Sequence, residues 1–377
     1  MTELTQQQIS ARQERGKTIA DAKSQIVIFE ENFYTVKSQS GNGEYAVCKV
    51  NGEWVCECPD HKYRNVKCKH IYAVEFSQKL KEEVKKNVNI QEVTVSKCVF
   101  CHSENIKKFG IRHNKAGDIQ RFLCGACGKT FSVNIGFERM KHNPRAITSA
   151  MQLYFSGESL RNTQDSLKLL GVEVSYRTIL NWIKKYTRLM QNYTESIVPN
   201  VGNTWRADEI YIKVRGNMKY LFSMMDDETR FWIAQEVAET KMQHDAKMLF
   251  FRAKRLMGKE PKVLITDGLP SYSVACEQVF ENTKHVRKIT FDGKVHNNNK
   301  MERMNGEIRD REKTMRGLKQ NRTPILKGYQ IYHNFIRPHE ALGGKTPSEV
   351  CGITIEGNDK WKTLIQNASE KQQNKSQ

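Results

Sequence analysis

The distribution of cysteine is the feature that most constrains how the first third of this chain can fold. Eight of the ten cysteines lie between residues 48 and 127, most of them in closely spaced pairs. The N-terminus lacks the apolar core of a secretory signal, so we expect a reducing, cytosolic environment in which such clusters favour zinc over disulfides. Segments this short bury little apolar surface, and we therefore expect small modules whose folding depends on metal.

Residues 44–76 predict a metal-binding finger. Two strands joined at Asn51-Gly52, a pair that type I′ hairpin turns favour, precede a helix that begins at about Lys69. Three thiolates and one imidazole, at the end of the hairpin and the start of the helix, can complete a tetrahedral zinc site. The candidate ligands are Cys56, Cys58, Cys68 and His70. This arrangement resembles the SWIM-type zinc finger. The alternatives are a hairpin with unligated cysteines, or a site in which Cys48 or His61 replaces one ligand.

Residues 95–135 predict a zinc ribbon. Two Cys-x2-Cys pairs, separated by 22 residues with a strand-turn-strand pattern around Gly117, supply four thiolates. These candidate ligands are Cys98, Cys101, Cys124 and Cys127. Gly128 permits the left-handed backbone that such a cysteine pair requires. The ribbon also carries basic side chains that suit phosphate contacts or simply a soluble surface. They are Lys107, Lys108, Arg112, His113, Lys115 and Arg121.

Residues 140–195 predict a trihelical helix-turn-helix. Apolar residues recur every three or four positions, the pattern breaks at Gly157 and Gly171, and Ser159 and Ser175 stand where N-caps belong. The third helix should bury Ile179, Ile183, Tyr186 and Met190. Its outward stripe consists of Arg177, Asn181, Lys184 and Arg188. Arginine and asparagine pair with base edges in the major groove, although a solvated basic face would look similar.

From residue 200 the pattern changes to three strands, a helix, a strand, a helix, a strand and a final helix. This order predicts an α/β fold of the RNase H-like type, with a mixed five-stranded sheet and flanking helices. Asp208 shares a strand face with Ile210 and Ile212, where an unpaired carboxylate is costly unless a cation is bound nearby. Asp267 ends a short apolar strand and Glu302 lies on the last helix. Each acid by itself could equally be a turn or surface residue.

Residues 140–355 resemble a DDE-type insertion-sequence transposase. The resemblance lies in WRADEIYIKVRG, YLFSMMDD, VLITDG, NNNKMERMNGEIRDREKTMRGLK and YHNFIRPHEALGGKTPSEV, and in the 34-residue interval between Asp267 and Glu302. It implies that Asp208, Asp267 and Glu302 bind two Mg²⁺ (or Mn²⁺) ions, and that Arg309 contacts DNA. Asn305 and Arg316 share the stripe of Glu302 and Arg309, and we expect them to line the DNA side of the helix. The nearby Asp226, Asp227 and Asp292 are expected to be structural or turn residues.

The net charge of +19 and the pI near 9.4 favour a polyanionic partner. The resemblance implies that this polyanion is double-stranded DNA, which the protein cleaves and joins as a homodimer or higher assembly. The alternatives are a transposase-derived regulator without catalysis and a metal-dependent nuclease. The sequence contains no run of 18 or more apolar residues, so it predicts no membrane-spanning helix. The expected order is a polar segment (1–30), finger (31–80), linker (81–94), ribbon (95–135), helix-turn-helix (140–195), catalytic domain (200–355) and polar tail (356–377).

Overall fold

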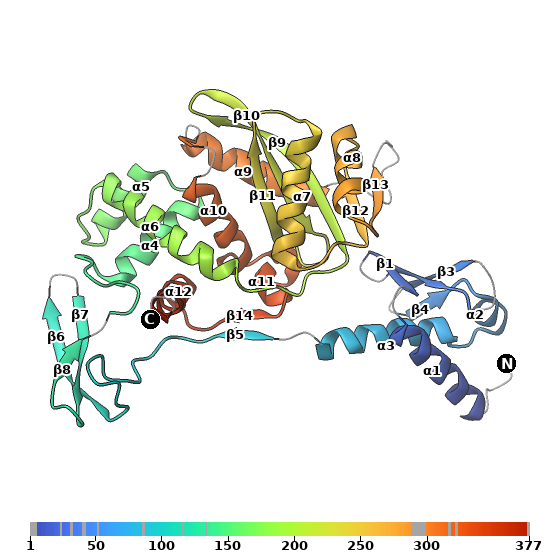
Figure 1. Cartoon of the computed structure of the whole chain (residues 1–377), viewed down its shortest axis with the longest axis horizontal. Coiled ribbons are helices and arrows are strands. Elements are labelled where there is room, and N and C mark those ends of the chain that lie inside the picture. Colours follow the sequence, from blue (N-terminus) through green and yellow to red (C-terminus); the bar gives the residue numbers. More distant parts are fainter. Residues whose placement is uncertain are drawn as a thin grey trace.

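The computed structural model describes residues 6–22, 25–30, 33–39, 43–50, 53–84, 87–114, 117–132, 134–287, 299–315, 318–320 and 323–374. A large body contains the helical and α/β regions, and two small units project from its opposite ends (Figure 1). The first small unit is formed by the N-terminal residues and the second by a β-hairpin and one further strand. None of the helices in the described part of the chain has the length and apolarity needed to span a bilayer.

The centre of the large body is a five-stranded sheet with the strand order β11-β10-β9-β12-β13. Its strands are β9 (Thr204–Val214), β10 (Asn217–Asp226), β11 (Trp232–Ala238), β12 (Val263–Thr266) and β13 (Lys284–Arg287). β9, β10 and β11 pair antiparallel, whereas β12 runs parallel to both β9 and β13. All four residues of β12 are buried, as expected for a strand covered on both faces. This mixed sheet has the RNase H-like order, and the predicted fold class is confirmed.

Helices cover both faces of this sheet (Figure 1). The helices are α7 (Gln243–Met257), α8 (Pro270–Val279) and α9 (Asn299–Met315). α7 and α8 pack together on one face, and α9 lies along β9 on the other. Met301, Met304 and Ile308 recur at helical spacing and are buried, so this stripe holds α9 against the sheet.

Three helices precede the sheet in the chain and form the predicted trihelical segment. They are α4 (Pro144–Ser156), α5 (Leu160–Leu169) and α6 (Tyr176–Thr194). The side chain of Ser159 accepts a hydrogen bond from the backbone N–H of Asn162, and that of Ser175 accepts one from Thr178, so both predicted N-caps are confirmed. All four side chains that were expected to point inward from α6 are buried.

The N-terminal unit is larger than the predicted finger. Its elements are α1 (Gln6–Asp21), β1 (Ile26–Glu30), β2 (Phe33–Lys37), β3 (Glu44–Val50), β4 (Glu53–Cys56), α2 (Pro59–Arg64) and α3 (Lys69–Val84). The predicted strands β3 and β4 pair antiparallel, and the turn residues Asn51 and Gly52 between them lie outside the described residues. α3 begins at Lys69, as predicted. α1, β1 and β2 were not predicted, and fully buried Ile19 anchors α1 in the core of the unit.

The second small unit is a three-stranded antiparallel sheet. Its strands are β6 (Ile106–Asn114), β7 (Gly117–Cys124) and β8 (Thr130–Ser132). Gly128, between β7 and β8, has a φ of 66°, the left-handed backbone that was predicted for it.

Two segments that were expected to be a linker and a polar tail belong to the core instead. Within residues 81–94, β5 (Val88–Ile90) pairs in parallel with β14 (Ile353–Ile355), and Ile90 is buried in the main hydrophobic cluster. Within residues 356–377, α12 (Lys360–Asn374) packs against α4 and α6. The polar composition concealed an apolar stripe at helical spacing, which consists of Trp361, Leu364, Ile365 and Ala368.

The remaining elements connect α9 to β14. They are α10 (Pro324–Ile331), a π-helical turn (Tyr332–Ile336), a 3₁₀ turn (Glu340–Leu342) and α11 (Pro347–Val350). The amide side chains of Gln330 and Asn334 both donate to the Trp232 carbonyl, so this connection is fixed to the edge strand β11.

Candidate active site and zinc sites

The strand register brings the first two acids together. β9 and β12 pair in parallel with Leu264 beside Trp205 and Ile265 beside Arg206. Continuing this register by two residues sets Asp267 beside Asp208. An oxygen of each carboxylate lies within 4.8 Å of the other, in a group that also contains Glu209. Two aspartates that are far apart in the sequence therefore face one another at the end of β12.

Asp208 lies in an environment that disfavours its negative charge. Burial is the largest cause, followed by the charges of Asp267 and Glu209, and together they raise the pKa of Asp208 to about 7. The charge of Glu302 raises this pKa further, while a hydrogen bond from the Glu209 backbone N–H to Asp208 Oδ1 opposes the rise. Such a cluster of carboxylates is suited to a divalent cation, because a cation relieves the repulsion that raises the pKa.

Glu209 was not predicted as part of this site. Its side chain is only 4% exposed; Lys241 Nζ donates to its Oε1 at 2.8 Å, and the hydroxyl of Tyr272 on α8 donates to its Oε2 at 2.7 Å. Burial, followed by the charge of Glu209, raises the pKa of Tyr272 well above its usual value, so the hydroxyl keeps its proton and remains a donor. The sequence signal was the second acid in Asp208-Glu209, but no spacing rule indicated that Tyr272 would reach it.

α9 supplies two further side chains. Glu302, on its first turn, is exposed and lies near enough to Asp208 for its charge to act there, but it is not in the close carboxylate group. Asn305, which was expected to line the DNA side, is buried instead, and its Nδ2 donates to Asp208 Oδ2 at 2.7 Å. The correction follows from helical geometry, because Asn305 adjoins the buried stripe at Met301, Met304 and Ile308 and faces the sheet with it.

The acids of this site fit hard divalent cations. Asp208, Asp267 and Glu302 offer carboxylate oxygens, the ligand type that Mg²⁺ and Mn²⁺ prefer. Lys241 neutralises Glu209, which leaves three carboxylates whose mutual repulsion a metal would relieve. The other acids expected to be structural have different partners: Asp226 accepts from Thr229, and Asp227 pairs with Arg206. Asp292 lies outside the described residues.

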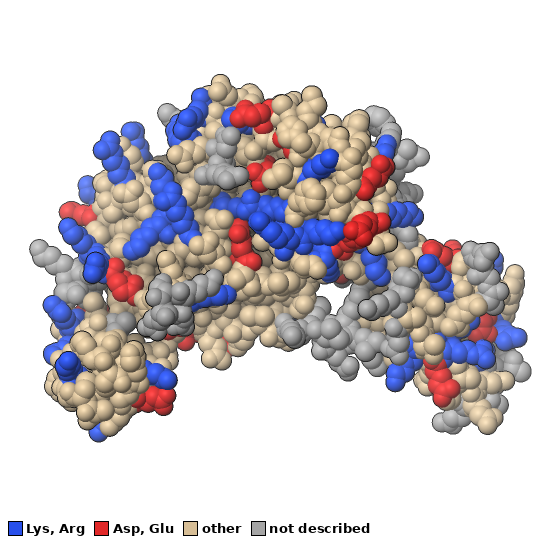
Figure 2. Space-filling model, viewed as in Figure 1, with Lys and Arg blue, Asp and Glu red and all other residues tan. Residues whose placement is uncertain are grey.

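The basic candidates for DNA contact lie on accessible surface. On α6, Arg177, Asn181 and Arg188 are exposed and Lys184 is partly exposed. Arg309 on α9 is exposed, whereas Arg316 lies outside the described residues. Figure 2 shows Lys and Arg side chains gathered in a band over the middle of the visible face, near α7. The surface is therefore suited to a polyanion.

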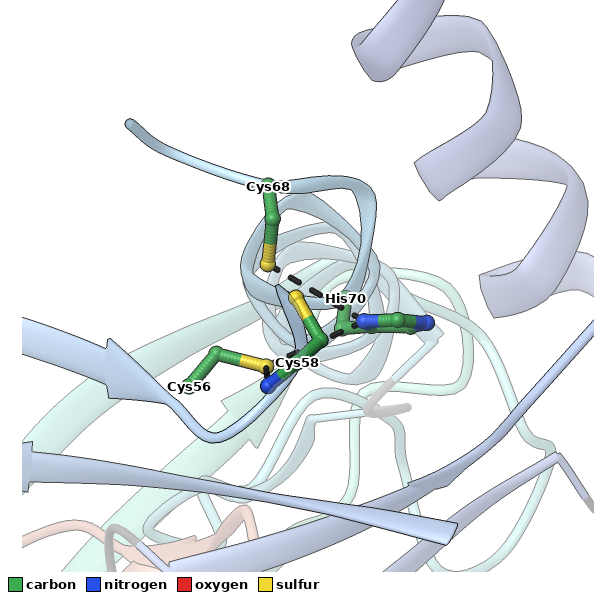
Figure 3. Close-up of side chains that lie close together, drawn as sticks. All are labelled: Cys56, Cys58, Cys68 and His70. Carbon is green, nitrogen blue, oxygen red and sulfur yellow. Dashed lines mark hydrogen bonds between the residues drawn. The ribbon is translucent and has the colours of Figure 1, made fainter. Parts of the chain in front are cut away.

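In the N-terminal unit the four predicted zinc ligands converge (Figure 3). His70 Nδ1 lies 3.8 Å from Cys56 Sγ and 4.0 Å from Cys68 Sγ. In a tetrahedron with zinc–sulfur bonds of about 2.3 Å and a zinc–nitrogen bond of about 2.0 Å, sulfur and nitrogen are about 3.5 Å apart. Hydrogen bonds from the Cys56 and Cys68 thiols hold the pKa of Cys58 well below its usual value, which favours a thiolate ligand. His61 instead contacts the carbonyl of Val66.

In the second small unit the four cysteines also converge, with every pair of sulfurs within 4.8 Å. Cys98 Sγ and Cys127 Sγ are 3.7 Å apart, and Cys101 Sγ and Cys124 Sγ are 3.6 Å apart. These distances are far longer than a disulfide bond of about 2.05 Å. They are close to the sulfur–sulfur edge of a zinc tetrahedron, about 3.8 Å. The backbone N–H of Phe100 donates to Cys98 Sγ, as expected of a Cys-x2-Cys turn around a metal.

Residues 202–339 match a protein family described as a DDE domain. Two similar proteins of Staphylococcus aureus are the transposase for insertion sequence-like element IS431mec (strain MW2) and the transposase for insertion sequence element IS257 in transposon Tn4003. Each is 29% identical to this chain over 152 residues, which is 39% of this chain and 66% of the relative. The match thus spans slightly less than two thirds of the length of these relatives.

Three solved structures of viral proteins are also similar to part of the chain. The HTLV-2 integrase catalytic core domain in complex with magnesium (trimeric form) is 18% identical with a TM-score of 0.31, covering 41% of this chain and 98% of that one. The catalytic core domain of BIV integrase is 14% identical with a TM-score of 0.31, covering 47% and 99%. The simian T-cell lymphotropic virus intasome in complex with PP2A regulatory subunit B56 gamma is 16% identical with a TM-score of 0.33, covering 53% and 72%. The strand order of the sheet, rather than these matches, defines the fold.

Proposed function

We propose that this chain is a DNA transposase that binds the ends of an insertion sequence, cuts them and joins them to target DNA, because residues 202–339 match a family described as a DDE domain. The observation that carries the proposal is the convergence of Asp208 and Asp267 at the sheet, with Glu302 on the helix that lies along β9. Without cations these acids repel one another, and burial, together with this repulsion, raises the pKa of Asp208 to about 7.

We assign Asp208, Asp267 and Glu302 as ligands of two Mg²⁺ (or Mn²⁺) ions. When bound, the ions would stabilise the attacking and leaving oxygens of a phosphodiester during in-line displacement. Three carboxylates against two divalent cations leave a charge of +1, which suits one DNA phosphate. Asn305 holds Asp208 from the helix side, and Glu209, held by Lys241 and Tyr272, supports the same strand from the opposite face. Arg309, exposed two turns after Glu302, is assigned to contact DNA beside the site.

The remaining modules are assigned to DNA ends. On α6, Arg177, Asn181, Lys184 and Arg188 would enter the major groove. Lys184 and Arg188 also line a groove of about 700 Å³ whose other wall includes Thr314 and Met315 at the end of α9, so that DNA held on α6 would be led towards the catalytic helix. Zn²⁺ at the two cysteine sites would hold the small units in shape. Joining two ends to one target requires both to be held together, so we expect a homodimer or a higher assembly.

Purified protein should be tested with duplex oligonucleotides taken from the inverted repeats that flank the coding region, in Mg²⁺ and with a plasmid target. We expect cleaved and joined products from the wild type and none from Asp267→Asn. Asp310→Asn is the matched control, because Asp310 is an exposed acid on α9 that pairs only with neighbouring Lys313 among the described residues.

Equal activity of Asp267→Asn and the wild type would refute the assigned site. Cleaved ends that are never joined would identify a nuclease instead. DNA binding without cleavage by the wild type would identify a regulator.

A further inference from the structure

Glu302 needs a local anchor if it is to serve the site. It lies three residues after the first residue of α9 and its side chain is exposed. The residues immediately before α9, 288–298, lie outside the described part of the chain. Within the described residues, contacts made by the first turn of α9 set the position of Glu302.

Lys300, two residues before Glu302, makes such a contact. Its Nζ donates to the backbone carbonyl of Asp227 at 2.9 Å and to Asp227 Oδ1 at 3.0 Å. Asp227 follows β10 directly, and its side chain is only 3% exposed. The same oxygen accepts from Arg206 Nε, and Arg206 is 4% exposed on β9. Because a buried carboxylate held by a buried arginine has little freedom to move, Lys300 is attached to a rigid part of the sheet.

This first contact joins α9 to β9 indirectly, through Asp227 and its ion pair with Arg206, and two further contacts join the helix to the strand directly. The second joins Asn305 to Asp208, and in the third the backbone N–H of Lys213 donates to the Glu312 carboxylate. The twelve residue steps from Lys300 to Glu312 rise about 18 Å along a helix. The seven residue steps from Arg206 to Lys213 span about 23 Å along a strand. The helix and strand thus run side by side, with Glu302 between the first and second attachments.

We propose that Lys300 is a positioning residue: through its ion pair with Asp227 it fixes the first turn of α9 and thereby aims Glu302 at Asp208 and Asp267. The proposal rests on the function proposed above. Two attachments on either side of Glu302 set both the height and the rotation of its turn, whereas Asn305 alone would leave the N-terminal end of the helix free to pivot. Lys300 itself touches neither DNA nor metal in this assignment.

The test compares Lys300→Met, which keeps the length of the side chain but removes its charge, with Lys300→Arg, which keeps the charge. Lys313→Met is the matched control, because Lys313 lies on the same helix but is 79% exposed and pairs with Asp310. For Lys300→Met we expect Mn²⁺ affinity about tenfold weaker by calorimetry and DNA cleavage about 10- to 100-fold slower, the range found when groups that orient metal ligands are lost. DNA affinity and thermal stability should stay close to those of Lys313→Met. Lys300→Arg should recover most of the loss.

Two results would overturn the proposal. One is Mn²⁺ binding and cleavage by Lys300→Met at wild-type levels. The other is equal impairment of Lys300→Met and Lys300→Arg together with lower thermal stability, which would show only a packing role. Glu302→Gln separates this question from the proposed function. If the wild type neither cuts nor joins DNA, the proposed function fails. Titration of the wild type, Glu302→Gln and Lys300→Met with Mn²⁺ would still report whether Lys300 acts through Glu302.

Discussion

Replacing Asp208 with Asn should stabilise the metal-free protein. Asn keeps the shape of the side chain and an oxygen for the amide of Asn305, but it removes the charge that burial and the neighbouring acids disfavour. The pKa of Asp208 rises from 3.8 to about 7. Each pKa unit corresponds to about 1.4 kcal/mol, so the ionised side chain costs the folded state about 4 kcal/mol.

The stability gained by the Asp208→Asn substitution should increase with pH. The folded chain keeps the proton on Asp208 up to about pH 7, whereas the unfolded chain releases it near pH 4. The stability that this proton contributes to the wild type is therefore fully present below pH 4 and is lost as the pH rises to about 7. The variant has no such proton to lose, so its advantage should grow by about 2.6 kcal/mol between pH 5 and pH 8.

Urea unfolding followed by tryptophan fluorescence measures this difference, because Trp205 and Trp232 are fully buried in the central sheet. The buffer should be freed of divalent ions on a chelating resin, without a soluble chelator that would also remove zinc. Adding Mg²⁺ should reverse the ranking, because the metal stabilises the wild type through a ligand that the variant lacks. A gain that is the same at pH 5 and pH 8, or that Mg²⁺ leaves unchanged, would refute the argument.

Three further outcomes are expected. The wild type should carry two zinc ions per chain by mass spectrometry of the metal content; Cys98→Ser should carry one, and Cys48→Ser, which alters a cysteine outside both groups, should keep two. Arg311→Met should weaken the packing of α9 on the helix-turn-helix by about 1–3 kcal/mol and lower the thermal midpoint, because Arg311 stacks on Tyr154 and donates to the Glu158 carbonyl beyond α4. An unchanged midpoint would contradict this. Trp361→Ala should reduce the free energy of unfolding by about 3–5 kcal/mol in urea titrations, since Trp361 is buried in the main core; a loss below about 1 kcal/mol would mean that α12 is dispensable.

Features that depend on local side-chain spacing and helix capping were predictable from the sequence. The buried side of α6, the caps at Ser159 and Ser175, the start of α3 at Lys69 and the succession of strands and helices after residue 200 follow from periodicity and capping. The fold class was therefore accessible before any coordinates.

Features that depend on tertiary contacts were not predictable in the same way. β5 has only three residues and becomes a strand because β14, more than 260 positions later, offers a parallel partner. Asn305 carries a polar side chain that suits either solvent or a buried carboxylate, and only the docking of α9 decides between them. The helix at the C-terminus was overlooked because overall polarity outweighed the spacing of its four apolar residues.

The pairing of β5 with β14 divides the connection between the two cysteine-rich units into two short segments. β5, within this connection, is paired with β14 of the large body. A residue inserted before Val88 would therefore change the position of the N-terminal unit only, and one inserted after Ile90 would change the position of the ribbon only. The distance of each unit from the large body therefore depends on its own connecting segment. Insertions or deletions in evolution can change the position of one unit without changing that of the other.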